Sequence, residues 1–311
     1  KPSLRTRIDY TPLTPETPYP ALFVDAAGNS TVDVSEGNDL LKMFQALNYH
    51  ATSSISSGKA IDETALLNIF SNTNNPFYDF SNNSVAVNGA ALNESSVQLR
   101  SAVASSLAEA DAEVVRAKLE SYFTAIDIAS QSVGNTASEG VAGKLGNYLV
   151  DARGLEVAQM IQKSLIGALQ LDYIGNVLLD EGLDTDNFQI VGDNNYTQLE
   201  HNWDVAYGLL TLNPIYLEGA TPTARNSKEF GIGSYMWEYN KENFAAIYPA
   251  FLKGRAAIVN NDREQYQALA TFIWVEMEKT IARAAVGYLG KWKDAAGDKA
   301  AEAHAIGEGV G

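Results

Sequence analysis

The chain has 311 residues, of which 46% are hydrophobic, which is enough for one large globular domain or two of ordinary size. Its 38 acidic and 22 basic residues give a formal charge of −16, which repels nucleic-acid phosphates, so we expect no nucleic-acid partner. Because cysteine is absent, disulfides and thiolate metal sites are excluded, and a transition metal would need nitrogen and oxygen ligands. The sequence also lacks an apolar run of the roughly 20 residues that a transmembrane helix needs.

Residues 1–35 predict an extended leader rather than a packed element. They contain five prolines among threonines, tyrosines and small residues, a composition that resists both helix and sheet. We expect this proline-rich leader to lie over the surface of the domain, with a strand-like fragment from Ala21 to Asp25 that forms a local pairing.

The remaining sequence predicts helices joined by loops. Ser35 or Asn38 caps a helix that runs through Leu47, and Asp62 caps a short helix from Glu63 to Phe70. Apolar periodicity predicts further helices over 95–132, 155–183, 197–212, 244–260 and 263–289, with an alanine-rich segment over 295–311. Loops are expected over 78–94, over the glycine-rich stretch 134–154, which we interpret as a flexible connection, and over 213–226. The fold class is therefore all-α, with a helical-bundle domain over 36–311 that is single or divided into two sub-bundles near 134–154.

The stretch YTQLEHNWDVAYGLL (196–210) carries the strongest candidate for a site. It holds His201, one of three histidines, beside Glu200 and one helical turn before Asp204. Residues three apart share a helical face, so the imidazole of His201 and the carboxylate of Asp204 could reach one bound ion. His304 and Glu308, four residues apart, form a second pair of this kind. Helix bundles build metal sites from inward-facing Glu and His side chains, so these five residues predict a divalent or ferric metal site.

A simpler interpretation of each pair is a surface histidine that is hydrogen-bonded to a neighbouring carboxylate. Other polar residues also have structural interpretations. We expect His50 to lie near a helix end, Glu156 to stabilise the start of a helix, and Glu276 and Arg255 to face solvent. The aromatic segment 235–239 is more typical of a core or an interface than of a ligand-stacking site.

The chain resembles a family of bacterial cell-surface or periplasmic lipoproteins that contain a domain of unknown function. The resemblance covers most of the chain and is carried by LLNIFSNTNNPF (66–77), EGVAGKLGNYLVDARGLEVAQMIQKSLIGAL (139–169), YTQLEHNWDVAYGLL, FLKGRAAI (251–258) and AHAIGEGVG (303–311). More distantly, the chain is similar to imelysin-like proteins, which are all-helical exported proteins with a His-x-x-Glu motif that are linked to iron uptake. His201 matches the motif histidine and Asp204 the glutamate, with a side chain one methylene shorter. Asn202 and Val205 replace a histidine and a glutamate of the family pattern.

The resemblance implies an imelysin-like bundle in an exported protein of the outer membrane, cell surface or periplasm. A lipidated cysteine ahead of Lys1 would be its only membrane attachment, with the leader as tether. The implied function is binding of a metal ion or an iron-related ligand for uptake. One alternative is a surface interaction or assembly protein with a protein partner, in which the histidine motif only ties helices together. The other is an imelysin-type metallopeptidase, which we disfavour because the sequence shows no complete set of zinc ligands with a general base.

Overall fold

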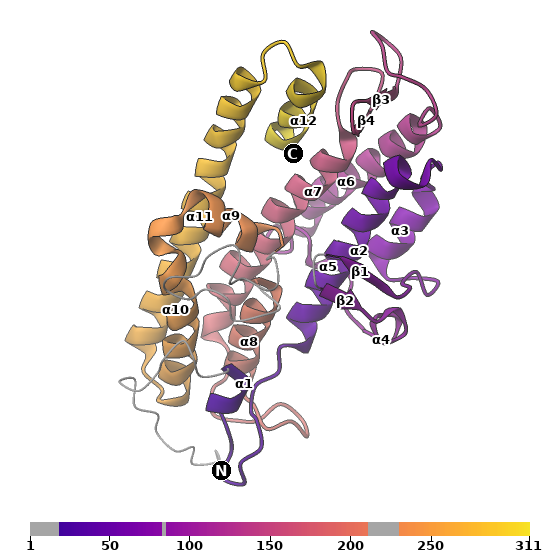
Figure 1. Ribbon diagram of the computed structural model, residues 1–311. Helices are drawn as coiled ribbons and strands as arrows, with labels where there is room; N and C mark the ends of the chain where they lie inside the picture. The colour runs from indigo at the N-terminus through magenta and orange to yellow at the C-terminus, as the bar shows by residue number, and fades with distance from the viewer. Residues whose placement is uncertain (1–18, 83–84, 211–229) are drawn as a thin grey trace. The chain divides into compact units, whose positions relative to one another are not determined.

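The computed structural model describes residues 19–82, 85–210 and 230–311. The described part is built mainly of helices, with two small two-stranded sheets, which confirms the all-α class (Figure 1). Within these ranges, no helix combines the length and hydrophobicity needed to cross a bilayer. Most of the predicted leader and the loop predicted over 213–226 lie outside the described residues.

The chain divides into two compact units made of interleaved segments. Unit 1 comprises residues 1–41, 83–85 and 170–280, and unit 2 comprises residues 42–82, 86–169 and 281–311. The chain passes from one unit to the other within α2 (Ser35–Ser57), within the π-helix η1 (Ile166–Leu178) and within α11 (Arg263–Asp294). The glycine-rich stretch 134–154 lies inside unit 2.

Unit 1 contains the helix that carries His201. Its elements, besides its shares of α2, η1 and α11, are α1 (Tyr19–Leu22), the 3₁₀-helix η2 (Glu181–Asp184), α8 (Gln198–Leu210), α9 (Ile232–Tyr239) and α10 (Lys241–Val259). Helix α8 packs against α10. Trp203 of α8 is fully buried, and its indole N–H donates to the Phe251 carbonyl oxygen at 3.0 Å. Burial of this large aromatic side chain is a main hydrophobic contribution to the packing of α8.

Two glycines allow the beginning of α2 to pass close to α8. A Cβ at Gly37 would overlap the backbone carbonyl of Val205, and a Cβ at Gly208 would lie 2.6 Å from the Val34 carbonyl oxygen. Only a residue without a side chain fits at such a close backbone approach. The approach places Glu36 of α2 beside α8, where it contacts His201.

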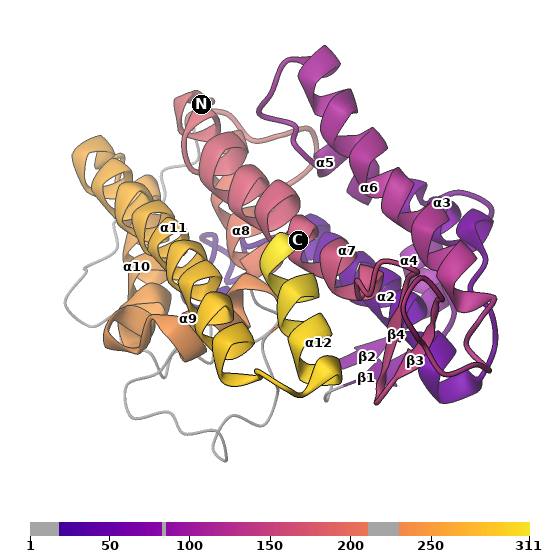
Figure 2. The same cartoon turned by 90° about the horizontal axis from the view of Figure 1, so that it is seen from above.

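Unit 2 is organised around α7 (Val157–Leu165), which packs against both α6 (Glu109–Ser130) and α12 (Lys299–Val310). Figure 2 shows α12 lying alongside α7. Strands β3 (Gly143–Leu145) and β4 (Tyr148–Val150) pair antiparallel, with Lys144 opposite Leu149, and β4 also contacts α12. The other elements are α3 (Glu63–Ser71), β1 (Phe80–Asn82), β2 (Val85–Val87), α4 (Gly89–Asn93) and α5 (Leu99–Ala102).

Several predicted elements differ from those observed. The flexible connection predicted over 134–154 is wrong, because the segment contains the β3–β4 hairpin, whose turn uses the positive φ of 60° at Gly146. The loop predicted over 78–94 contains β1, β2 and α4. The N-cap Asn88 starts α4 by accepting the backbone N–H of Ala91. Helix α11 continues past Gly290 to Asp294, where Lys291 and Lys293 favour a helix C-terminus electrostatically.

Candidate functional sites

The start of α8 is fixed by reciprocal hydrogen bonds between Thr197 and Glu200. The Glu200 carboxylate accepts the Thr197 backbone N–H at 2.8 Å and its hydroxyl at 3.2 Å, and the Glu200 N–H donates to the Thr197 hydroxyl at 3.3 Å. This arrangement is a capping box, and the spacing Thr-x-x-Glu is its sequence signature. The carboxylate of Glu200, which we predicted as a metal ligand, is therefore hydrogen-bonded to Thr197 at the start of its own helix.

A fully buried arginine binds both acidic residues of the predicted α8 site. Arg255 of α10 donates from Nη1 to Glu200 at 2.6 Å, from Nε to Asp204 at 2.9 Å and from Nη2 to the Thr31 carbonyl oxygen at 3.1 Å. The Tyr19 hydroxyl also donates to Asp204, at 2.7 Å. We call these residues the Arg255 cluster. The prediction that Arg255 faces solvent is wrong, because the buried carboxylates on α8 supply its counter-charges.

The Arg255 cluster places two buried carboxylates, those of Glu200 and Asp204, against one guanidinium. Burial raises the pKa of Asp204, while Arg255 opposes that shift. A metal ion could use Glu200 or Asp204 only by displacing Arg255, which already satisfies both. The cluster therefore ties α8 and α10 to the segment that precedes α2.

His201 makes its closest ionic contact with Glu36 rather than with Asp204. Its Nε2 lies 3.5 Å from a Glu36 carboxylate oxygen, and the Tyr173 hydroxyl donates to the other oxygen at 3.0 Å. The ring of Tyr196 stacks on the imidazole at a centroid distance of 4.7 Å. Burial disfavours the charged imidazole, but the carboxylates of Glu36, Asp33 and Asp204 together outweigh this effect, Glu36 most of all, and raise the pKa of His201. Sequence reasoning missed Glu36 and Tyr173 because only the fold brings these residues to α8.

In unit 2 the predicted pair of His304 and Glu308 is brought together with three further residues, Glu156, Lys163 and Tyr148. His304 Nδ1 lies 2.6 Å from Glu156, and Nε2 lies 3.5 Å from Glu308, which also pairs with Lys163 at 3.2 Å. Tyr148 of β4 stacks on the imidazole at a centroid distance of 4.4 Å. The hydrogen bond to Glu156 raises the pKa of His304. With His304 protonated, two acidic groups balance two basic ones, so Glu156 does more than stabilise a helix start.

The two predicted histidine sites belong to different units, since His201 lies in unit 1 and His304 in unit 2. A single metal site that combines them stays a prediction. Within the part of the chain that the structure describes, no group of three or more histidine, aspartate or glutamate side chains is arranged to hold a metal ion. Each predicted ligand is instead in contact with a group of opposite charge or a histidine.

The structure also tests the expectations for His50, Glu276 and the aromatic segment 235–239. His50 lies inside α2 rather than near its end, and burial lowers its pKa. Glu276 is buried, not solvent-exposed, and accepts hydrogen bonds from Asn240, Asn243 and Lys279 at 2.7–2.8 Å. In the aromatic segment, Tyr235 is buried, in agreement with a core role.

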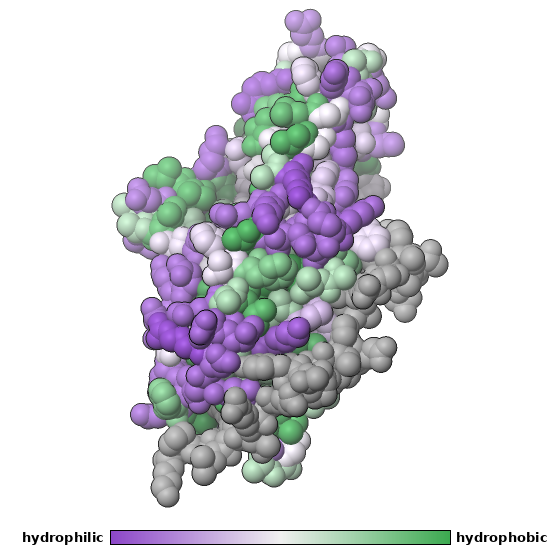
Figure 3. Space-filling view, turned by 90° about the vertical axis from the view of Figure 1, so that its left-hand side faces the viewer, coloured by the Kyte–Doolittle hydropathy of each residue, from purple (hydrophilic) through white to green (hydrophobic). Residues whose placement is uncertain are grey.

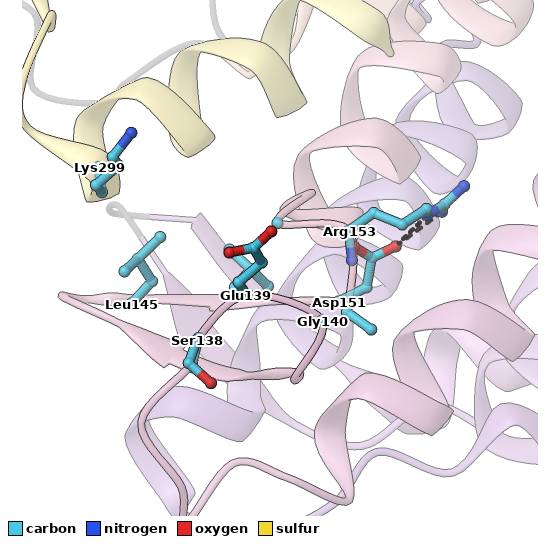
Figure 4. Close-up of a pocket in the computed structure, with 11 residues that line it drawn as sticks. Ser138, Glu139, Gly140, Leu145, Asp151, Arg153 and Lys299 are labelled. Carbon is cyan, nitrogen blue, oxygen red and sulfur yellow. Dashed lines mark hydrogen bonds and ion pairs between the residues drawn. The ribbon is translucent and has the colours of Figure 1, made fainter.

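Unit 2 also contains a surface hollow of about 520 Å³ between the β3–β4 hairpin, the loops on both sides of it and the N-terminus of α12 (Figure 4). One carboxylate of its polar wall is already paired. Asp151 forms an ion pair with Arg153 at 2.7 Å and accepts hydrogen bonds from the backbone N–H groups of Arg153 and Leu155. Gly154, with a φ of 82°, closes that turn. The hollow is lined by Ala137, Ser138, Glu139, Gly140, Leu145, Val150, Asp151, Ala152, Arg153, Gly154 and Lys299.

Glu139 differs from Asp151 in having no partner. Figure 4 shows its carboxylate between the Asp151–Arg153 pair and the side chain of Leu145. Among the described residues, none forms a hydrogen bond or ion pair with this carboxylate. Lys299, at the first position of α12, also lines the hollow and pairs with Glu302 at 3.5 Å, and Leu145 supplies apolar surface. The hollow thus combines one acidic group without a counter-charge, two basic groups that are paired with other carboxylates, and a small apolar wall.

Comparison with known proteins identifies the family. The model described as "Domain of unknown function (DUF4856)" matches residues 22–311. The chain belongs to the DUF4856 family. Searches of curated proteins and of solved structures found no match. The resemblance to a lipoprotein family with a domain of unknown function is confirmed at the level of that domain, and the similarity of this DUF4856 chain to imelysin-like proteins stays a prediction.

Proposed function

We propose that this DUF4856 protein is a non-catalytic binding protein, and that the hollow in unit 2 binds a small ligand with an ammonium group. The observation that carries the proposal is the Glu139 carboxylate, which lies in a concave site without a counter-charge of its own. Ligand sites commonly combine apolar walls with a few convergent polar groups. An ammonium group supplies both a positive charge and N–H donors, so it forms charge-assisted hydrogen bonds with a carboxylate.

The rest of the lining narrows the class of ligand. Arg153 pairs with Asp151 and Lys299 with Glu302, but both cationic side chains are exposed, and such groups suit a ligand carboxylate. Leu145 suits a short aliphatic side chain. A zwitterionic ligand of the size of a free amino acid or dipeptide satisfies all three features, and it fits a hollow of about 520 Å³.

The test is a thermal-melting screen of the full chain with the free L-amino acids and glycylglycine as probes. A ligand that binds only the folded state raises the melting temperature, by a free energy of about 2.7 kcal/mol at a hundred times Kd. Glu139→Gln should remove the response, whereas Glu94→Gln, which changes another exposed glutamate of unit 2, should keep it. A screen with no stabilising probe, or a response that survives Glu139→Gln, would contradict the proposal.

A second candidate function is binding of a metal ion at His201 and Glu36, as the predicted link to iron uptake requires. The supporting observation is the 3.5 Å between His201 Nε2 and the Glu36 oxygen. Two ligands about 2.1 Å from one ion in tetrahedral geometry lie about 3.4 Å apart. His201 and Glu36 supply two protein ligands, so water or a bound chelator would complete the coordination. Hydrolysis at a zinc ion usually needs three protein ligands, which disfavours the metallopeptidase alternative.

Titration with Zn²⁺ and with Fe³⁺ as its citrate complex, followed by thermal melting, tests this second function. A stabilising ion should lose its effect in His201→Ala and in Glu36→Gln. The same ion should still stabilise Asp204→Asn, because Asp204 is bound to Arg255 and Tyr19. Loss of the effect in Asp204→Asn alone would restore the His-x-x-Asp pair as the ligand set. The exported, lipid-anchored location stays a proposal from resemblance, for which fatty-acid labelling of the full-length precursor in cells is the direct assay.

A further inference from the structure

Three segments of unit 2 form the walls of the hollow. They are the β3–β4 hairpin with the loop before it, the turn over 151–154, and the start of α12, which contributes Lys299. In Figure 4, Lys299 and Arg153 lie at opposite ends of the group of lining side chains, with Glu139 between them. A ligand that contacts all of these side chains binds tightly only when the three segments are already held in the right arrangement.

His304, which does not line the hollow itself, connects the three segments. It belongs to α12 and follows Lys299 by five residues. Its imidazole stacks on Tyr148 of the hairpin, with ring centroids 4.4 Å apart and ring planes inclined by 10°. Its Nδ1 lies 2.6 Å from the carboxylate of Glu156, the second residue after the turn over 151–154. One side chain thus links all three wall segments.

Glu156 is tied to the turn through the residue before it. Glu156 is the N-cap residue of α7, but its side chain makes no capping hydrogen bond and pairs with His304 instead. The Leu155 carbonyl oxygen accepts the Asp151 N–H at 2.9 Å, and the Leu155 N–H donates to the Asp151 carboxylate at 3.0 Å. The same carboxylate pairs with Arg153 in the wall of the hollow. A change in the position of Glu156 therefore reaches the lining residues through one short hydrogen-bonded turn.

Helix α12 lies close to the other two segments on both sides of His304. A Cβ at Gly146 in the hairpin turn would lie 3.0 Å from the Cβ of Ala300, and a Cβ at Gly307 would lie 3.0 Å from the Glu156 carbonyl oxygen. Such close packing leaves little room for α12 to move on its own. Loss of the His304 contacts would therefore act on the hairpin, the turn and the helix together.

The charged groups around His304 favour its protonated form. The hydrogen bond to Glu156 raises the pKa of His304 and Glu308 adds to this effect, whereas burial and Lys163 oppose it. The phenol ring of Tyr148 also faces the imidazole. A protonated imidazole donates from both ring nitrogens, and its charge-assisted hydrogen bond with Glu156 is stronger than that of a neutral ring. The connection between the wall segments is therefore firmer when His304 is protonated.

We propose that His304 is a positioning residue for the ligand of the hollow. Its contacts with Tyr148 and Glu156 hold the hairpin, the turn and the start of α12 in the arrangement that the ligand contacts. This inference rests on the function proposed for the hollow. The affinity for the ligand is highest below about pH 6.5 and falls as the pH rises through the raised pKa of His304. Because such coupling is reciprocal, the bound ligand stabilises protonated His304 by the same factor.

The general charge of the molecule predicts the opposite pH dependence. The chain has a net charge of −16, and Figure 3 shows hydrophilic side chains spread over much of one face of the molecule. As the pH rises, ionisable groups lose protons and the chain becomes more negative, which strengthens its attraction for the ammonium group of a ligand. A fall in affinity with rising pH therefore separates the role of His304 from this general effect.

The test is isothermal titration of the full chain between about pH 6 and about pH 8.5, with the free L-amino acids and glycylglycine as probes. The variants are His304→Gln, Glu156→Gln and, as a matched control, His50→Gln, which removes another histidine of unit 2 that does not line the hollow. Comparison of each variant with the wild type at the same pH cancels the titration of the probe itself. Hydrogen exchange of the backbone amides of residues 143–155, measured without ligand and corrected for the intrinsic rate at each pH, reports how firmly the walls are held.

We expect the wild type and His50→Gln to lose about fivefold or more in affinity over this pH range, the lower end of typical coupling between two sites. His304→Gln should bind more weakly than the wild type at about pH 6, with less protection of residues 143–155, and should lose this pH dependence. Glu156→Gln should move the fall in affinity to lower pH, because His304 loses the carboxylate that raises its pKa.

Three results would overturn the inference. Binding that is equally strong and equally pH-dependent in His304→Gln would overturn it and leave the proposed function intact. Weaker binding by His304→Gln with unchanged protection of residues 143–155 would also overturn it, because His304 would then not act through the walls. Absence of binding by every probe in the wild type would contradict the proposed function, and the inference with it.

Discussion

Replacement of Arg255 by methionine is the sharpest perturbation of unit 1. The change keeps a long apolar side chain in the site but removes the only guanidinium that binds Glu200 and Asp204 within the described Arg255 cluster. Both carboxylates would then stay buried and lose their ion pair with Arg255. The buried side chains cannot relax into solvent, because Glu200 is held by the helix start and Asp204 by Tyr19.

The expected cost follows from the contacts that are lost. Breaking a buried ion pair by removing one partner costs about 3–5 kcal/mol. By contrast, Asp204→Asn removes one of the two carboxylates that pair with Arg255 and keeps an oxygen that can accept from Tyr19 and Arg255. We expect it to cost about 0.5–1.5 kcal/mol, the typical net value of a hydrogen bond. In the Arg255→Met background, Glu200→Gln and Asp204→Asn together should recover part of the lost stability.

Urea unfolding followed by tryptophan fluorescence measures these differences, and three of the four tryptophans belong to unit 1. The predicted order of stability is wild type, then Asp204→Asn, then Arg255→Met. The reasoning would be refuted if Arg255→Met stayed within about 1 kcal/mol of the wild type, or if Asp204→Asn were the more damaging change.

Three further predictions use the same urea assay. Gly254→Ala should destabilise by about 1–3 kcal/mol, because its Cβ would overlap the indole of Trp203, and a wild-type midpoint would contradict that packing. Gly290→Ala, at a helical position with open space, should stabilise by about 0.5–1 kcal/mol, and a loss would show that the helix does not continue there. The stability difference between the wild type and His304→Gln should be largest below about pH 6.5 and should shrink as the pH rises through the raised pKa of His304, since Glu156 stabilises the protonated imidazole. A difference that did not change with pH would contradict this.

Local patterns in the sequence were sufficient for the fold class and for several helix boundaries. Asp62 caps α3 as predicted, with its side chain accepting the Thr64 backbone N–H. The hairpin in the glycine-rich stretch was missed because its strands have three residues each, too few to show a periodicity. The glycines in this stretch, which we interpreted as a sign of flexibility, supply the positive φ angles of tight turns.

The candidate sites were predictable only within one helix at a time. His304 and Glu308 are four residues apart and do come together, whereas His201 contacts Glu36, which no helical spacing could indicate. The burial of Arg255 could not be predicted from the sequence either. A charged side chain is expected to face solvent unless carboxylates of another helix are known to pair with it.

The most direct test of the proposed function is isothermal titration of the full chain with the probe that stabilises it most among the free amino acids and glycylglycine. The account predicts one site per chain. It also predicts a loss of about tenfold or more in affinity for Glu139→Gln, the value of one charge-assisted hydrogen bond, and unchanged affinity for Glu94→Gln. Absence of binding heat with every probe, or equal affinity of wild type and Glu139→Gln, would contradict the assignment of the hollow as the ligand site.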